Sequence, residues 1–118
     1  MNKQDLSEVV TELSKPLETD NAHQIMHQAS IAEAHLPRIG LEKRKYEKLL
    51  SEKKNELLPE ITGTVQEKEI QLDSLTAELS QQFNVLKDVE KQIFTRLSLC
   101  QSFLKYMSEE VKRQLIDR

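Results

Sequence analysis

The sequence has few of the residues that build turns, thick cores and covalent crosslinks. Its 118 residues include two glycines, three prolines, one cysteine and no tryptophan, and only 4% are aromatic. So few aromatic residues can fill a thin core at most, and so few glycines and prolines leave little room for turns. A single cysteine excludes an intrachain disulfide and fits a reducing compartment. These shortages favour one small domain built from long helices.

The chain also lacks a strong charge of one sign and a long apolar run. Its formal net charge is −3, which argues against general affinity for nucleic acid. No apolar run approaches the roughly 20 residues of a membrane-spanning helix, and residues 1–10 contain no hydrophobic signal region. We therefore expect a soluble intracellular protein that is cytoplasmic, nuclear or spindle-associated, with no membrane span and no specific nucleic-acid partner.

The stretch from Thr64 to Leu115 carries the strongest helical pattern. Thr64 and Glu67 have the spacing of a capping box, and no glycine or proline follows Gly63. Apolar residues recur at every seventh position, and a second set drifts by one place, so the stripe repeats close to every 3.6 residues. The members at every seventh position are Val65, Leu72, Leu79, Leu86, Ile93, Cys100 and Met107. We predict one long, nearly straight C-terminal helix over residues 64–116.

Three shorter helices are predicted before it. Apolar faces indicate helices over residues 3–15, 22–36 and 38–58, with Asp20 or Asn21 able to cap the second. The first ends before Pro16, and Pro37 is placed to separate the second helix from the third. The fold class that follows is all-α, an elongated helical hairpin or coiled-coil-like bundle. Residues 1–36 would form the short amphipathic helices, and residues 37–118 the hairpin.

The turn of that hairpin is predicted at residues 59–63, where Pro59 and Gly63 flank three residues. Residues 38–54 hold seven basic and three acidic side chains, for a net charge of +4. Residues 55–90 hold eight acidic and two basic ones, for −6. A chain reversal would place these opposite charges side by side, which selects an orientation more than it adds stability. A kinked but continuous helix over residues 38–115 is the alternative.

The C-terminal half of the long helix is apolar on two sides. Ile93, Leu104 and Met107 belong to the main stripe, whereas Leu99, Phe103 and Tyr106 lie well round the helix. We call this trio the second row. A helix that is apolar on two sides is normally covered on two sides. The predicted partner-binding residues are therefore Val85, Ile93, Phe94, Leu99, Phe103, Leu104, Tyr106 and Met107. Coverage by the chain's own shorter helices is the alternative.

The sequence offers only weak candidates for metal-binding or catalytic residues. His23 and His27 are four residues apart on a predicted helix, but a zinc site needs three or four ligands and no clear third ligand is present. Cys100 lies in the apolar stripe, where it behaves as a small hydrophobic residue. Neither of the two glycines belongs to a phosphate-binding loop. We expect no metal, no cofactor and no catalytic activity.

Two functions from different classes fit this pattern. The first is a structural subunit or scaffold in a larger helical assembly, of cytoskeletal, kinetochore, spindle or tethering type, which binds other helical subunits through the long helix. The second is a small helical chaperone or adaptor for an export substrate or regulator. A homodimeric coiled-coil regulator that binds through the basic segment is a third. Hetero-oligomers are favoured over homo-oligomers. The segment Arg38–Lys54 could weakly contact an acidic surface, although interleaved glutamates also suit an ordinary solvated helix face.

Overall fold

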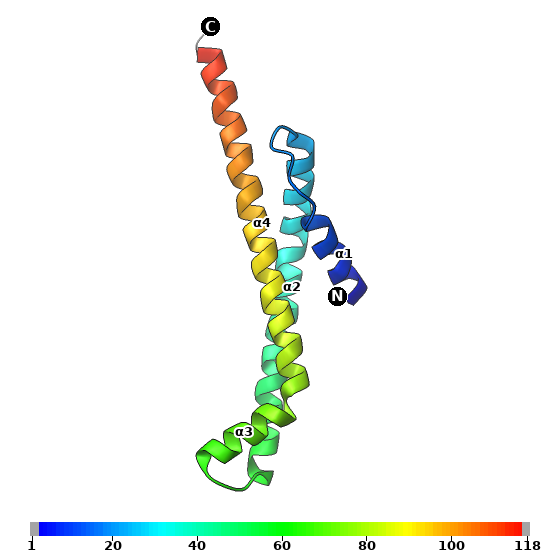
Figure 1. The fold of residues 1–118 in the computed structure, drawn as a ribbon, viewed down its shortest axis with the longest axis vertical. Helices are drawn as coiled ribbons and strands as arrows, with labels where there is room; N and C mark the ends of the chain where they lie inside the picture. The colour runs from blue at the N-terminus through cyan, green and yellow to red at the C-terminus, as the bar shows by residue number, and fades with distance from the viewer. Residues whose placement is uncertain (1–2, 117–118) are drawn as a thin grey trace. The chain divides into compact units, whose positions relative to one another are not determined.

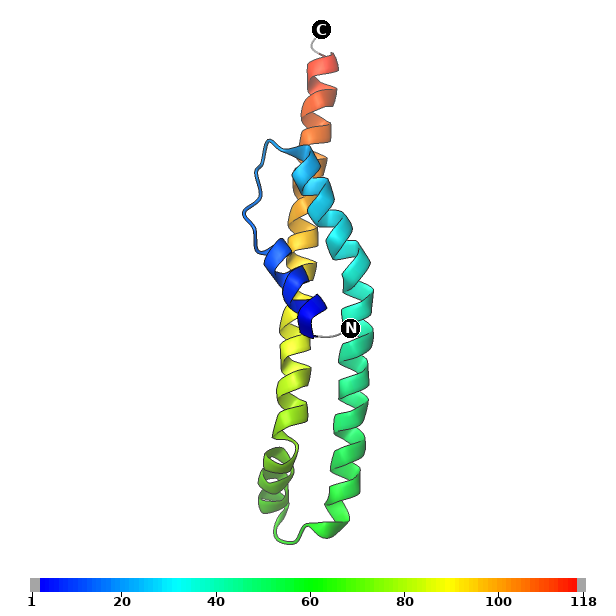
Figure 2. The same cartoon turned by 90° about the vertical axis from the view of Figure 1, so that its right-hand side faces the viewer.

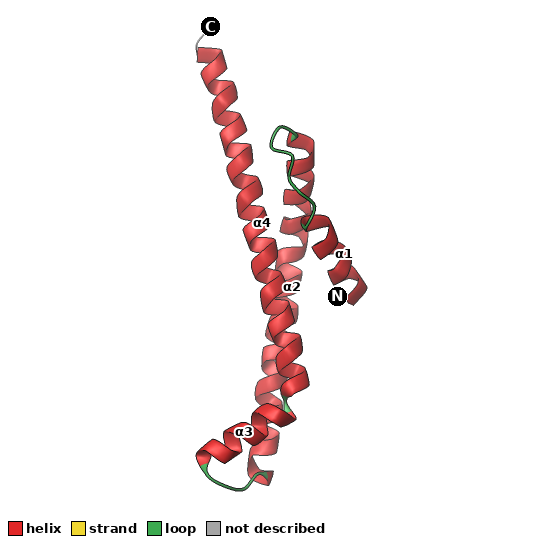
Figure 3. Ribbon diagram, in the orientation of Figure 1, coloured by secondary structure: helices red, strands yellow, loops and turns green. Residues whose placement is uncertain are grey.

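The computed structural model describes residues 3–116, with side chains from Leu6 onward, and this part of the chain is helical without any strand (Figure 3). The helices are α1 (Lys3–Leu13), α2 (Ala22–Leu57), α3 (Val65–Leu75) and α4 (Ala77–Ile116), and a short 3₁₀ helix, η1, spans Leu58–Glu60 (Figure 1). The predicted all-α fold with a long C-terminal helix is confirmed. No helix within the described range is both long enough and apolar enough to cross a membrane.

The start of α2 is capped as the sequence indicates. The Asn21 side-chain oxygen accepts a hydrogen bond of 3.1 Å from the Gln24 N–H. This bond satisfies one of the backbone donors that the first turn of a helix leaves without a partner. Of the two candidate caps, the structure therefore selects Asn21.

The predicted helix break at Pro37 is wrong, because α2 continues through this residue to Leu57. Proline has no N–H for the carbonyl group four residues earlier, and its ring crowds that carbonyl, which costs roughly 3 kcal/mol inside a helix. Ala32 and Ile39, one on each side of Pro37, are both fully buried. Burial on both sides favours keeping the two segments in one helix. The expected helices 22–36 and 38–58 are thus a single element.

The chain reverses at the predicted turn. Gly63 has φ +124°, a conformation that residues with a Cβ rarely adopt. Beside it, the Thr64 hydroxyl accepts a hydrogen bond of 3.2 Å from the Glu67 N–H, and the Glu67 carboxylate accepts one of 3.3 Å from the Thr64 N–H. The predicted capping box is therefore present. Beyond the turn, Lys54 of α2 lies 3.8 Å from Asp73 of α3, which excludes a continuous helix over 38–115.

The predicted long helix is interrupted once, at Thr76, so that α3 and α4 replace a single helix over 64–116. Thr76 is buried, and its φ and ψ of −109° and 13° lie outside the helical range. Its hydroxyl donates a hydrogen bond of 2.6 Å to the Leu72 carbonyl. A threonine hydroxyl competes in this way with the regular backbone bonds of a helix. Neither a glycine nor a proline marks this break in the sequence.

The described residues group into two compact units. Unit 1 contains α1, α2 up to Arg38, and α4 from Glu90 onward, whereas unit 2 contains residues 39–89. Within each unit the portions of α2 and α4 run in opposite directions (Figures 1 and 2). The core of unit 1 is formed by Ile25 and Ala29 of α2 with Cys100 of α4. Whether residues 1–36 and 37–118 form separate domains stays a prediction.

Unit 2 has a thin core. Its buried apolar residues are Ile39, Ile61, Leu86 and Val89, and none of the residues of α3 is buried. The Gln71 side-chain amide donates a hydrogen bond of 3.2 Å to the Thr62 carbonyl, which ties α3 to the turn. Because α3 buries so little surface, its capping box carries an unusual share of its stability.

We expect Thr64→Ala to lower the free energy of unfolding by about 0.5–2 kcal/mol, because the Glu67 N–H would lose its side-chain acceptor. The measurement is urea unfolding followed by circular dichroism. Thr62→Ala is the control, since Thr62 lies in the same turn, is exposed and uses its carbonyl rather than its hydroxyl. Equal effects of the two substitutions would show that the capping box does not stabilise α3.

Candidate helix-binding surface

The residues predicted to bind a partner fall into two groups. Ile93 is only 1% exposed, and Phe103, Leu104 and Met107 are half-buried against the core of unit 1. In contrast, Phe94, Leu99 and Tyr106 are 59%, 43% and 63% exposed. Val85 belongs to unit 2 and is also exposed. In unit 1 the chain therefore covers its own main stripe and Phe103, which leaves Leu99 and Tyr106 as the more exposed part of the second row.

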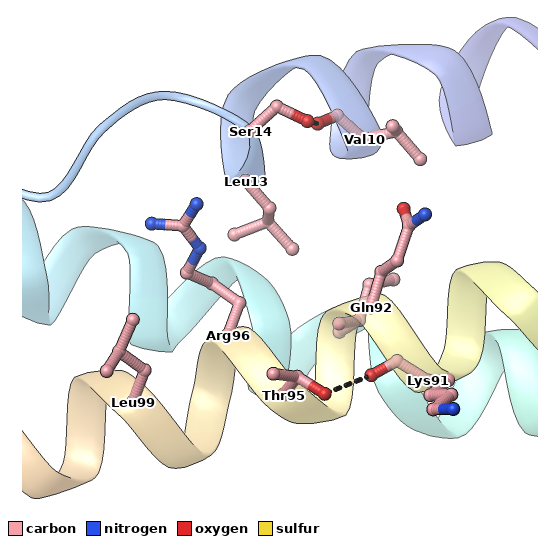
Figure 4. Close-up of a pocket in the computed structure, with 9 residues that line it drawn as sticks. Val10, Leu13, Ser14, Lys91, Gln92, Thr95, Arg96 and Leu99 are labelled. Atoms are coloured by element: carbon pink, nitrogen blue, oxygen red, sulfur yellow. Dashed lines mark hydrogen bonds between the residues drawn. The ribbon is translucent and has the colours of Figure 1, made fainter.

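The second row begins beside α1. A groove of about 390 Å³ lies between α1 and α4. Its lining consists of Val10 and Leu13 of α1, Ser14 just after that helix, and six residues of α4: Lys91, Gln92, Ile93, Thr95, Arg96 and Leu99. Val10 and Leu13 point from α1 toward α4, and Gln92 and Arg96 rise from α4 toward α1 (Figure 4). Leu99 lies at one end of the groove. Since α1 ends at Leu13, it flanks the start of the second row but not its continuation to Tyr106.

The position of α1 as a wall of the groove depends on contacts with α2. The Gln28 side-chain amide, which is fully buried, donates a hydrogen bond of 3.3 Å to the Glu12 carbonyl. The Glu12 carboxylate accepts a hydrogen bond of 2.7 Å from Lys15 and lies 3.8 Å from His27. The hydrogen bond from Lys15 is the main reason that the pKa of Glu12 is lowered. Polar contacts from Gln28 and His27 thus join α1 to α2, where the apolar residues Val9 and Ile31 also lie, while Val10 and Leu13 face the groove beside α4.

A second hollow, of about 400 Å³, lies between α1 and α2 and has a different character. Its lining contains acidic and basic side chains: Glu8, Glu12, His27, His35 and Arg38. Mixed charges of this kind can satisfy one another and define no single ligand. The groove along α4 is therefore the better candidate for a helix-binding surface.

The fold does not bring the candidate metal-binding and catalytic residues together into a site. His23 and His27 are both exposed on α2, and among the described residues no three potential ligands are placed to hold a metal ion. Cys100 is fully buried in the core of unit 1, and its burial raises the pKa of the thiol. A thiol that is kept protonated is a poor nucleophile.

Two cationic residues of the groove, Lys91 and Arg96, were not among the residues predicted from the sequence. Lys91 and Arg96 lie on either side of the row that contains Leu99, because successive residues are turned by about 100° around the helix. In the described part of the chain, no carboxylate lies within ion-pair distance of either side chain. One sequence signal was available: Arg96 interrupts a position where the heptad pattern calls for an apolar residue.

Comparison of this chain with protein-family models, with curated proteins and with solved structures finds no match.

We expect Cys100 to react with a thiol reagent on the order of a hundredfold more slowly in the native protein than in concentrated guanidinium chloride. The physical reason is that the buried thiol must first be exposed by an opening of the fold. The measurement is the rate of colour release from an aromatic disulfide. Equal rates in the two conditions would show that Cys100 is accessible in the folded chain and that the α2–α4 core is open.

Proposed function

We propose that this protein is a non-catalytic structural subunit of a larger helical multiprotein assembly, and that α4 binds a helix of another subunit. The observation that carries the proposal is the uncovered continuation of the second row, Leu99 and Tyr106, next to the groove beside α1. Apolar side chains that lie in a row next to a groove are typical of helix-in-groove recognition.

Aromatic side chains contribute strongly to such interfaces when they become buried there. Tyr106 combines a large apolar ring with a hydroxyl, and its exposed fraction of 63% leaves most of that ring available. Phe103 is a poorer candidate than the sequence suggested, since it packs against the chain's own core. The partner-binding surface proposed for unit 1 is therefore centred on Leu99 and Tyr106 rather than on Phe103.

The packing of Phe103 also favours the second candidate function, a self-contained helical chaperone or adaptor. A chain that covers its own main stripe can fold without a partner and bind a client only transiently. The two functions differ in the mass of the particle that contains the protein. A structural subunit stays in a larger complex, whereas a chaperone is mainly recovered as the free chain. Membership of a cytoskeletal, kinetochore, spindle or tethering complex is part of the first proposal.

The combined change Leu99→Ala and Tyr106→Ala tests the proposal. In the isolated chain we expect the free energy of unfolding to fall by no more than about 1 kcal/mol, because Tyr106 is largely exposed and neither side chain is buried. In the assembly we expect association to weaken by about 2–4 kcal/mol, the range of central interface residues. The measurements are chemical unfolding of the isolated chain and the native mass of the complex purified from source cells.

Leu104→Ala is the matched control, because Leu104 packs against the core of unit 1. We expect it to destabilise the isolated chain by about 2 kcal/mol or more through loss of packing. If the double variant destabilises the isolated chain as strongly as this control, the second row is internal core. If instead the double variant leaves the mass of the complex unchanged, the surface is not used for assembly. Recovery of the wild-type protein only as the free chain would favour the chaperone or adaptor.

A further inference from the structure

We infer that the helix bound along α4 is an acidic amphipathic helix whose apolar face is bordered on both sides by glutamate or aspartate. This inference rests on the proposed function, and it names the chemistry of the partner. Its basis is the charge of the groove: Lys91 and Arg96 line it from opposite sides of the row that contains Leu99.

Arg96 and Lys91 are placed where each could pair with a carboxylate of a helical partner. Arg96 is half-buried, and it rises from α4 beside Leu13 of α1 (Figure 4). Within the described chain no carboxylate lies within 4.0 Å of the charged group of Arg96 or Lys91. A carboxylate supplied by a partner could form the paired hydrogen bonds that guanidinium groups favour. Since Lys91 lies on the other side of the row that contains Leu99, the partner needs acidic groups on both edges of its apolar face.

The length of the surface favours a helix over a small amphiphile. The groove of about 390 Å³ ends near Leu99, but the exposed row continues to Tyr106, seven residues further along α4. Seven residues of helix span about 10 Å. A small ligand would fill the groove and leave Tyr106 uncovered. A helix laid along α4 would cover the groove, Leu99 and Tyr106 together, and would present side chains at the same helical spacing.

The test uses two stapled helical peptides with leucine at the a and d positions of three heptads. One carries glutamate at every e and g position, and the other carries lysine there. Binding of each labelled peptide to the full chain is measured by fluorescence anisotropy at low and high salt. We expect the glutamate peptide to bind at least about tenfold more tightly, with a preference that weakens at high salt because ions screen the charges.

Charge reversal in the protein makes the test specific. The combined change Lys91→Glu and Arg96→Glu should invert the preference, so that the lysine peptide binds more tightly. The control combines Lys105→Glu and Lys112→Glu, which alters the net charge equally. Both control positions lie about 120–140° around α4 from Leu99, and the control should keep the preference for glutamate. If the reversed variant is unfolded by circular dichroism, Lys91→Gln with Arg96→Gln should give nearly equal affinities.

Three results would overturn the inference. The first is equal binding of the two peptides to the wild-type chain, and the second is an unchanged preference in the folded charge variants. The third is binding of the protein to vesicles containing phosphatidylserine but to neither peptide, which would assign the cations to a membrane surface. If the peptides fail while Leu99→Ala with Tyr106→Ala still dissociates the native complex, the proposed function stands and only the acidic partner is wrong. If that double variant also has no effect, both proposals fail.

Discussion

The close packing of α2 on α4 in unit 1 is the interaction on which the rest of this surface depends. Ile25 and Ala29 contribute buried side chains from α2, and Cys100 contributes one from α4. Two of these three residues are small, so the helix backbones can approach closely. The buried stripe of α4 is narrow, and Leu99 and Tyr106 on its flank stay 43% and 63% exposed.

The exposure of the flank of α4 that contains Leu99 follows from this packing. The α1 helix covers only the beginning of the flank, where Val10 and Leu13 face α4 across a groove. The α1 helix is held by the burial of Val9 and Leu13 and by the bond from Gln28 of α2 to the Glu12 carbonyl. A short helix held in this way forms one wall of a groove but does not close it. The uncovered apolar residues and the cations beside them thus arise from the same arrangement of helices.

Local signals in the sequence predicted the local structure well. Thr64 with Glu67 specified a capping box, and Asp20 with Asn21 offered two candidate caps of which Asn21 is used, because such caps depend only on neighbouring residues. The break expected at Pro37 is absent and a break that was not expected occurs at Thr76, because the effects of these residues depend on burial, which continues α2 through a proline and lets α4 begin after a threonine. Phe103 was assigned to a partner although it contacts the chain's own core. Helical periodicity shows which residues share a face, but it does not show which neighbour covers that face.

Photo-crosslinking in source cells tests most directly whether the second row is a binding surface. Tyr106 would be replaced by benzoylphenylalanine in one variant and Phe103 in another, since Tyr106 is exposed and Phe103 contacts the core. The account predicts crosslinks from position 106 to a helical segment of another polypeptide and mainly intrachain crosslinks from position 103. Absence of crosslinks from position 106 to any other polypeptide, with the protein otherwise folded, would contradict a binding role for the second row.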